Sequence, residues 1–128
     1  YAIDSVDTAG DVAAVAGCTV ITGTLAVGDS SWTDLSYLSN LTSVDFLWIA
    51  GSAGLTSLDG LENLTSVGFL EIEENYGLTN VDGLSSLTSV GLLDVFLNES
   101  LCQSEVDDLI VDLGAGLRGA KARGKAVV

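Results

Sequence analysis

Residues Asp45–Val90 read DFLWIAGSAGLTSLDGLENLTSV followed by GFLEIEENYGLTNVDGLSSLTSV, which is one 23-residue unit written twice. The same unit extends backward over Thr22–Val44 and, with less fidelity, forward over Gly91–Leu113. A period between about 20 and 50 residues is typical of a solenoid, in which each unit buries its apolar side only by stacking on a neighbour. The sequence therefore predicts a single-domain repeat solenoid, a β-helix of about four 23-residue coils.

Each unit carries a strand pattern followed by a corner pattern. Two aliphatic residues two positions apart have the period of a half-buried strand, and we expect them to point inward. They recur as Leu25/Val27, Leu47/Ile49, Leu70/Ile72 and Leu93/Val95. From Leu55 to Val67 the apolar residues instead recur at every third position, which favours tight turns or 3₁₀ corners. The chain has no proline, so glycine, asparagine and aspartate are expected at these corners.

The two ends of the chain depart from the repeat. We expect a short helical cap in which Asp11 begins a turn that Gly17 ends. After the last strand, Ser104 is expected to cap a second helix, whose apolar face follows helical spacing as Val106, Leu109, Ile110, Leu113 and Leu117. The predicted organisation is an N-terminal cap over 1–17, solenoid coils over 18–103, a C-terminal capping helix over 104–117 and a basic flexible tail over 118–128.

The charge is distributed very unevenly along the chain. The four basic residues all follow Leu117, so residues 1–117 contain the 18 acids and no base. Such a body repels nucleic acid and anionic membranes, which excludes both as expected partners. No uninterrupted apolar run approaches the ~20 residues of a membrane span, so direct membrane insertion is not expected either. The chain begins at Tyr1 and contains no methionine, and we expect it to be a processed or excised piece of a longer protein.

Three stretches resemble one known family. They are the acidic segment from Asp11 into Cys18 with ITGTL after it, the LTSLDGLENLTSV units, and the closing NESLCQSEVDDLI. Over about residues 5–113 the chain resembles the receptor L-domain family, the leucine-rich-repeat-like solenoids of insulin- and growth-factor-receptor ectodomains. It is more similar still to bacterial and fungal cell-surface proteins that carry the same unit.

The resemblance implies a right-handed, leucine-rich-repeat-like β-helix and a non-catalytic domain in adhesion, ligand binding or cell-wall organisation. It implies an extracellular or cell-surface location, with the protein secreted or anchored through parts outside this chain. No ligand-binding residue carries over, because the matching positions are core and corner. The chain departs from the family at Cys18, which lacks the nearby second cysteine of receptor L domains, and in the basic tail, which matches nothing in the family.

The outward side of the strands is the predicted binding face. If Leu47 and Ile49 point inward, strand alternation sends their neighbours outward. Aromatic groups surrounded by acids are a usual composition for a recognition patch, and tryptophan is enriched among binding hot spots, so Trp48 is expected to contribute most. The alternative is that the column of Phe46 and Phe69 is partly buried. The candidate ligand-binding residues are Phe46, Trp48, Phe69, Glu71, Glu73, Asp94 and Phe96. The expected partner is a protein or a cell-surface glycan.

Enzymatic chemistry and metal binding are not expected. The chain has no histidine, no phosphate-binding glycine loop and no serine motif with an activating base, so no catalytic residue or cofactor is predicted. Asp59 and Glu62 could pair as carboxylates, but they occupy corner positions of the repeat. The acids around Glu73 lack the spacing of a calcium loop, so no metal is predicted. The repeated threonines are either an ice-binding array or simply tolerated repeat residues.

A second hypothesis for function is self-assembly. The ends of a solenoid are sheet edges unless they are capped, so coils of one copy can stack on those of the next in an open filament. Cys18 and Cys102 lie at opposite ends of the array, on the order of 15 Å apart at ~4.8 Å per strand, too far for an intrachain disulfide. Both are therefore candidate assembly residues, and the alternative function is a homo-oligomeric structural subunit of a surface filament or matrix.

Overall fold

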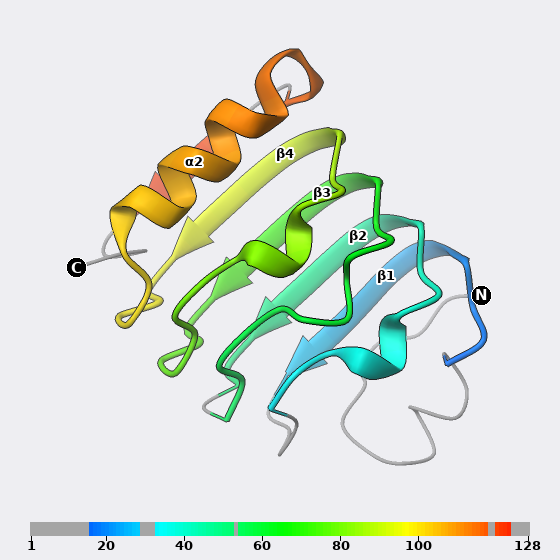
Figure 1. The fold of residues 1–128 in the computed structure, drawn as a ribbon, viewed down its shortest axis with the longest axis horizontal. Coiled ribbons are helices and arrows are strands. Elements are labelled where there is room, and N and C mark those ends of the chain that lie inside the picture. The colour runs from blue at the N-terminus through cyan, green and yellow to red at the C-terminus, as the bar shows by residue number, and fades with distance from the viewer. Residues whose placement is uncertain (1–15, 29–32, 53, 118–119, 124–128) are drawn as a thin grey trace.

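The computed structural model describes residues 16–28, 33–52, 54–117 and 120–123. Five strands form one parallel sheet in the order β1-β2-β3-β4-β5. Figure 1 shows β1 to β4 side by side, with each strand followed by a return path across the front of the sheet. The predicted solenoid is confirmed as a parallel β-solenoid of about three turns. The strands are β1 (Val20–Gly28), β2 (Ser43–Ala50), β3 (Ser66–Glu73), β4 (Ser89–Phe96) and β5 (Ala120–Arg123).

The strands pair in the register of the 23-residue repeat. Leu47 aligns with Leu70 and Leu70 with Leu93, so equivalent residues of successive units stack. Between β1 and β2 the register shifts between Ile21 and Thr24. Gly23 lies in this irregularity with a φ of 87°, and its N–H donates to Asp45 Oδ2 at 3.0 Å. Glycine adopts such positive φ values without steric cost, which explains its place in this strand.

The core consists of the inward columns that the sequence predicts. The paired strand residues and the repeated leucines and valines of the return paths from Leu35 to Leu101 are buried, with the exposed fraction of Leu47, Ile49 and Leu70 at 0%. The return paths contain the predicted 3₁₀ corners, η1 (Ser36–Leu38) and η2 (Asp82–Leu84). Each unit thus buries its apolar side against the units before and after it, as expected for a solenoid.

The repeated threonines tie successive coils together. The hydroxyls of Thr42, Thr65 and Thr88 each donate to the backbone carbonyl of the threonine one unit earlier, at 2.9, 3.1 and 3.1 Å. Thr56 and Thr79 form a second column with the same pattern. These hydroxyl protons are committed to the fold, which argues against an ice-binding array and gives the threonines a structural role that the sequence interpretation missed.

A pair of buried asparagines closes the corners after β3 and β4 and forms a short ladder. Asn75 and Asn98 are both fully buried. Asn98 Oδ1 accepts the Asn75 backbone N–H at 3.0 Å and its Nδ2–H at 3.1 Å. Asn75 Oδ1 in turn accepts the Ser52 N–H at 3.2 Å. The equivalent position one unit earlier is Ser52, whose side chain is too short to continue the ladder.

Ser52 gives a first stability prediction. Its side chain is 1% exposed and its Oγ has no hydrogen-bond partner among the described residues. Burying a hydroxyl without a partner costs free energy. We expect Ser52→Ala to leave the free energy of unfolding unchanged or to raise it by up to about 1 kcal/mol, measured by urea denaturation. A clear loss of stability would show that the hydroxyl has a partner in solution.

The C-terminal end differs from the predicted one in three respects. The fourth unit supplies β4 and then leaves the coil as helix α2 (Gln103–Leu113), so a complete fourth coil does not form. The helix begins at Gln103 with Cys102 as its N-cap residue, so the predicted cap at Ser104 is wrong. After the 3₁₀ turn η3 (Gly114–Gly116), residues Ala120–Arg123 pair with β4 as β5, where a flexible tail was predicted.

The physical reason for β5 is that β4 would otherwise end the sheet with an unpaired row of backbone groups.

Helix α2 has the predicted face, with Val106, Leu109 and Leu113 buried and Ile110 packed against the core. The N-terminal cap predicted over 1–17 falls almost entirely on residues 1–15, which lie outside the described residues.

Candidate functional site

The predicted binding face lies on the outward side of the sheet, as strand alternation requires. Register aligns Phe46, Phe69 and Leu92 in one column across β2, β3 and β4, and Trp48, Glu71 and Asp94 in another. The rings of Phe46 and Phe69 stack with centroids 4.6 Å apart and an interplanar angle of 5°. Both phenylalanines are half-buried, so this column contributes more to sheet packing than the prediction of an open patch assumed.

Trp48 is the open member of the face. Its side chain is 40% exposed, and its indole Nε1–H donates to Glu73 Oε1 at 2.8 Å. Glu73 lies one strand over and two residues beyond the register partner of Trp48, so the bond crosses the sheet diagonally. A hydrogen bond to a carboxylate fixes the ring orientation while leaving ring surface in contact with solvent. The result is a pre-oriented aromatic surface beside Glu71 and Glu73.

The far end of the face is more enclosed than predicted. Asp94 is only 5% exposed, and Phe96 is half-buried, so neither is an open contact residue. The reason is β5, whose Lys121 and Arg123 stand in register with Asp94 and Phe96. A residue in the interior of a sheet has neighbours on both sides, and the sequence interpretation placed no strand beyond β4. The usable patch therefore centres on Trp48, Glu71 and Glu73.

Cys18 and Cys102 lie at opposite ends of the described solenoid. Neither is in a disulfide, which agrees with the prediction that they are too far apart to pair. Cys18 is half-buried and packs against the core just before β1. Cys102 is exposed at the start of α2, where reagents and partner chains can reach it.

Metal ligation finds no support in the geometry of the described residues. No group of three or more histidine, cysteine, aspartate or glutamate side chains in the described ranges is arranged to hold a metal ion. Asn75, the amide that follows these acids in the sequence, is buried in the asparagine ladder. Glu73 is engaged by Trp48.

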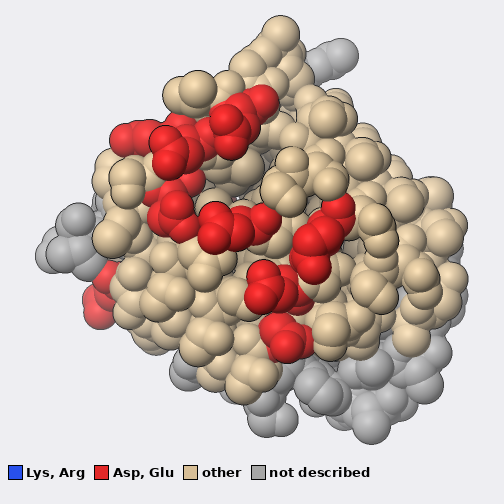
Figure 2. Space-filling view, in the orientation of Figure 1, with Lys and Arg blue, Asp and Glu red and all other residues tan. Residues whose placement is uncertain are grey.

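The return-path side of the molecule carries a band of acids that lies outside the predicted binding face. Figure 2 shows acidic side chains gathered over α2 and continuing across the corners in front of the sheet. One member of this side, Asp34, lies close to the half-buried Tyr37. Burial, and then the charge of Asp34, raise the pKa of the Tyr37 phenol well above its usual range, so this hydroxyl stays protonated.

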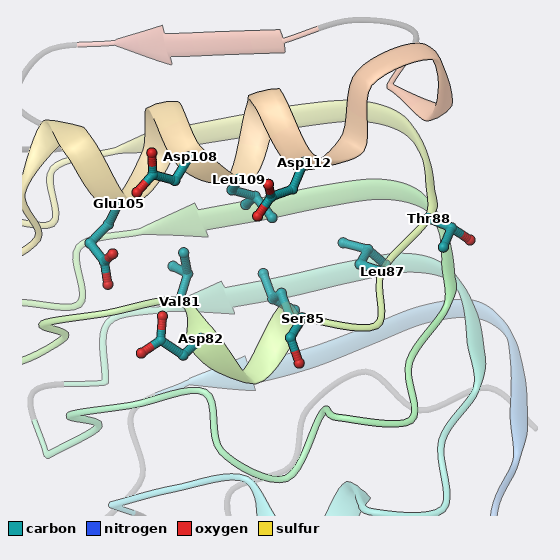
Figure 3. Close-up of a pocket in the computed structure, with 10 residues that line it drawn as sticks. Val81, Asp82, Ser85, Leu87, Thr88, Glu105, Asp108, Leu109 and Asp112 are labelled. Carbon is teal, nitrogen blue, oxygen red and sulfur yellow. The ribbon is translucent and has the colours of Figure 1, made fainter.

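Within this band a groove of about 650 Å³ separates α2 from η2. Asp82 lines one wall, and Glu105, Asp108 and Asp112 line the other (Figure 3). The sequence signal for it was available: the fourth unit replaces the repeat's corner leucines by a helix with acids at helical spacing.

Comparisons of the chain with protein-family models, with curated proteins and with solved structures found no significant match. In the part of the chain that the structure describes, no helix has both the length and the apolarity needed to cross a bilayer.

Proposed function

We propose that this chain is a non-catalytic binding or adhesion module of the extracellular space or cell surface. The observation that carries the proposal is Trp48, an exposed aromatic ring held in one orientation by Glu73 on a solid parallel sheet. Interface hot spots are enriched in tryptophan on rigid supports, because such a side chain loses little entropy on binding. The partner is a protein or a cell-surface glycan, since exposed aromatic side chains bind both classes of molecule.

The same proposal includes the finer identity of the fold. We infer a right-handed, leucine-rich-repeat-like solenoid of the receptor L-domain type. Its supports are the LTSLDGLENLTSV units, the 23-residue register of the strands and the asparagine ladder after them. The acidic body further argues against nucleic acid and anionic lipid as partners, since residues 16–117 contain no lysine or arginine.

The test of the binding face compares Trp48→Ala with Tyr76→Ala. Tyr76 is 48% exposed but lies outside the strands, so it controls for the loss of an exposed aromatic ring. The chain is applied to glycan and secreted-protein arrays, and each ligand found is titrated against both variants. We expect Trp48→Ala to weaken binding by about 2 kcal/mol or more and Tyr76→Ala to leave it unchanged.

The melting temperature is measured in parallel. Because the Trp48–Glu73 bond is solvent-exposed, its loss should cost about 1 kcal/mol or less. Unchanged affinity in Trp48→Ala, or a large loss of stability, would overturn the binding face. A Trp32→Phe background leaves Trp48 as the one tryptophan of the chain, so its fluorescence then reports binding directly.

Self-assembly is the second candidate, favoured by the edges of the sheet. In the described structure β1 and β5 are the outer strands and run parallel, so a second copy placed head to tail would continue the same parallel sheet. Cys18 and Cys102 lie near the two ends. Light scattering and electron microscopy with and without reductant test this: filaments support the structural-subunit function, and a monomer under both conditions removes it.

A further inference from the structure

The groove between α2 and η2 exists because the fourth unit does not complete a coil. In the central unit the corner leucines Leu58, Leu61 and Leu64 are 0% exposed, since coils on both sides cover them. Their equivalents one unit later, Val81, Leu84 and Leu87, are 6%, 2% and 5% exposed. Helix α2 covers this layer slightly less completely than a coil would, so the edges of these three side chains line the bottom of the groove.

The walls of the groove are acidic on both sides. Asp82 projects from η2, while Glu105, Asp108 and Asp112 project from α2 (Figure 3). None of these four carboxylates has a hydrogen bond or salt bridge within the described part of the chain, and residues 16–117 offer no base to pair with them. Like charges on the two walls of one groove repel, and a cationic ligand between them would relieve that repulsion.

Asp112 is an independent sign that helix stability does not account for these acids. It lies in the last turn of α2, which contains no basic residue. The helix macrodipole is negative at that end and favours lysine or arginine there, not aspartate. An acidic residue at the unfavourable end of a helix, with no contact in the fold that compensates for it, indicates a role in binding and not in stability.

We propose that this groove docks a basic segment of a partner polypeptide, with lysine or arginine residues spaced by small or aliphatic ones. The aliphatic stems of lysine and arginine lie well along an apolar floor while their charged ends reach carboxylates on the walls. The acidic walls together with the apolar residues at the bottom of the groove select this occupant over an anionic or purely apolar one. A metal ion is a poor occupant, because no three ligands in the described residues are gathered to hold it. This site is separate from the Trp48 face and does not depend on it.

The test uses a fluorescein-labelled peptide of repeated Lys-Leu-Arg-Ala units, about 12 residues long, titrated by fluorescence anisotropy at about 50 mM salt, where surface charges are weakly screened. The groove variant is Asp82→Asn/Asp112→Asn. The matched control is Asp59→Asn/Asp107→Asn, which removes two charges from the same repeat column and the same helix but outside the groove. All four positions are exposed, and their melting temperatures verify folding.

We expect the groove variant to bind the peptide about five- to tenfold more weakly than the control variant, and binding to weaken as salt rises. Replacing the peptide's leucines by serine should also weaken binding, because the floor is apolar. If the two variants lose the same affinity for the peptide, the binding comes from the overall negative charge of the protein, and the groove is not the site. If spermine binds as tightly as the peptide, or if the peptide does not bind at all, the proposal of a polypeptide occupant is overturned.

Discussion

Replacing Asn75 by alanine is expected to lower the free energy of unfolding by about 3–5 kcal/mol, because one side chain satisfies several buried groups. Its Nδ2–H groups donate to the Ile49 carbonyl at 3.0 Å and to Asn98 Oδ1 at 3.1 Å. Its Oδ1 accepts the Ser52 N–H at 3.2 Å. Alanine leaves the Ile49 carbonyl and the Ser52 N–H without these buried bonds, while Asn98 Oδ1 keeps only the backbone N–H of residue 75. A buried group that loses its partner costs about 1–3 kcal/mol.

The measurement is urea denaturation followed by circular dichroism, with Asn63→Ala as control. Asn63 also donates from its side chain to a carbonyl one unit earlier, that of Ser39 at 2.7 Å, but at an exposed corner. Water can replace that bond, so the control should lose about 1 kcal/mol or less. Similar losses in both variants would mean that the buried ladder contributes no more than a surface bond, contrary to the burial of Asn75.

The regular part of the fold could be predicted because repetition averages out local ambiguity. Leu47, Leu70 and Leu93 each look like ordinary strand residues, but their recurrence at one period fixes both the register and the inward direction. The 3₁₀ corners followed from the three-residue spacing of leucines in the same way. The threonine and asparagine ladders were not foreseen, because their partners are backbone groups one unit away, which the side-chain pattern does not display.

The ends of the chain could not be predicted with equal success, because the repeat pattern does not extend to them. The segment Ala120–Arg123 has few apolar residues, and its basic composition predicted a mobile tail. It forms a strand because the edge of β4 offers unpaired backbone groups, which is a property of the sheet and not of the segment's own sequence. That strand in turn encloses Asp94, which strand alternation alone had placed on an open face. Trp48, in the middle of the array, lies outward as predicted.

These differences determine where partners can bind. A solenoid of identical coils offers each face as a flat, continuous surface. Here the strand face narrows to Trp48 and the two glutamates beside it, because β5 occupies its C-terminal side. The return-path face gains a groove at the one place where a helix substitutes for a coil. The two proposed sites thus lie on different faces, and binding at one leaves the other accessible to a second partner.

Gly60→Ala is expected to destabilise the solenoid by about 3–5 kcal/mol, through strain and collision together. Gly60 has a φ of 115°, a conformation that side chains with a Cβ rarely adopt. A Cβ built there would overlap the backbone carbonyl of Leu35 in the coil before. That carbonyl has little room to move, since Leu35 is fully buried and its N–H donates to the Asp59 carbonyl at 2.8 Å.

Gly51→Ala separates the two contributions. Gly51 also has a positive φ, 67°, but a Cβ there meets nothing within 4 Å. It should cost only the left-handed strain, about 1–2 kcal/mol. Chemical denaturation of the two variants then measures, as their difference, the collision together with the extra strain of a φ of 115° over one of 67°. If the variants lose equal stability, the coils can separate locally without cost, and the close stacking of the corner of Gly60 on Leu35 is not a determinant of the fold.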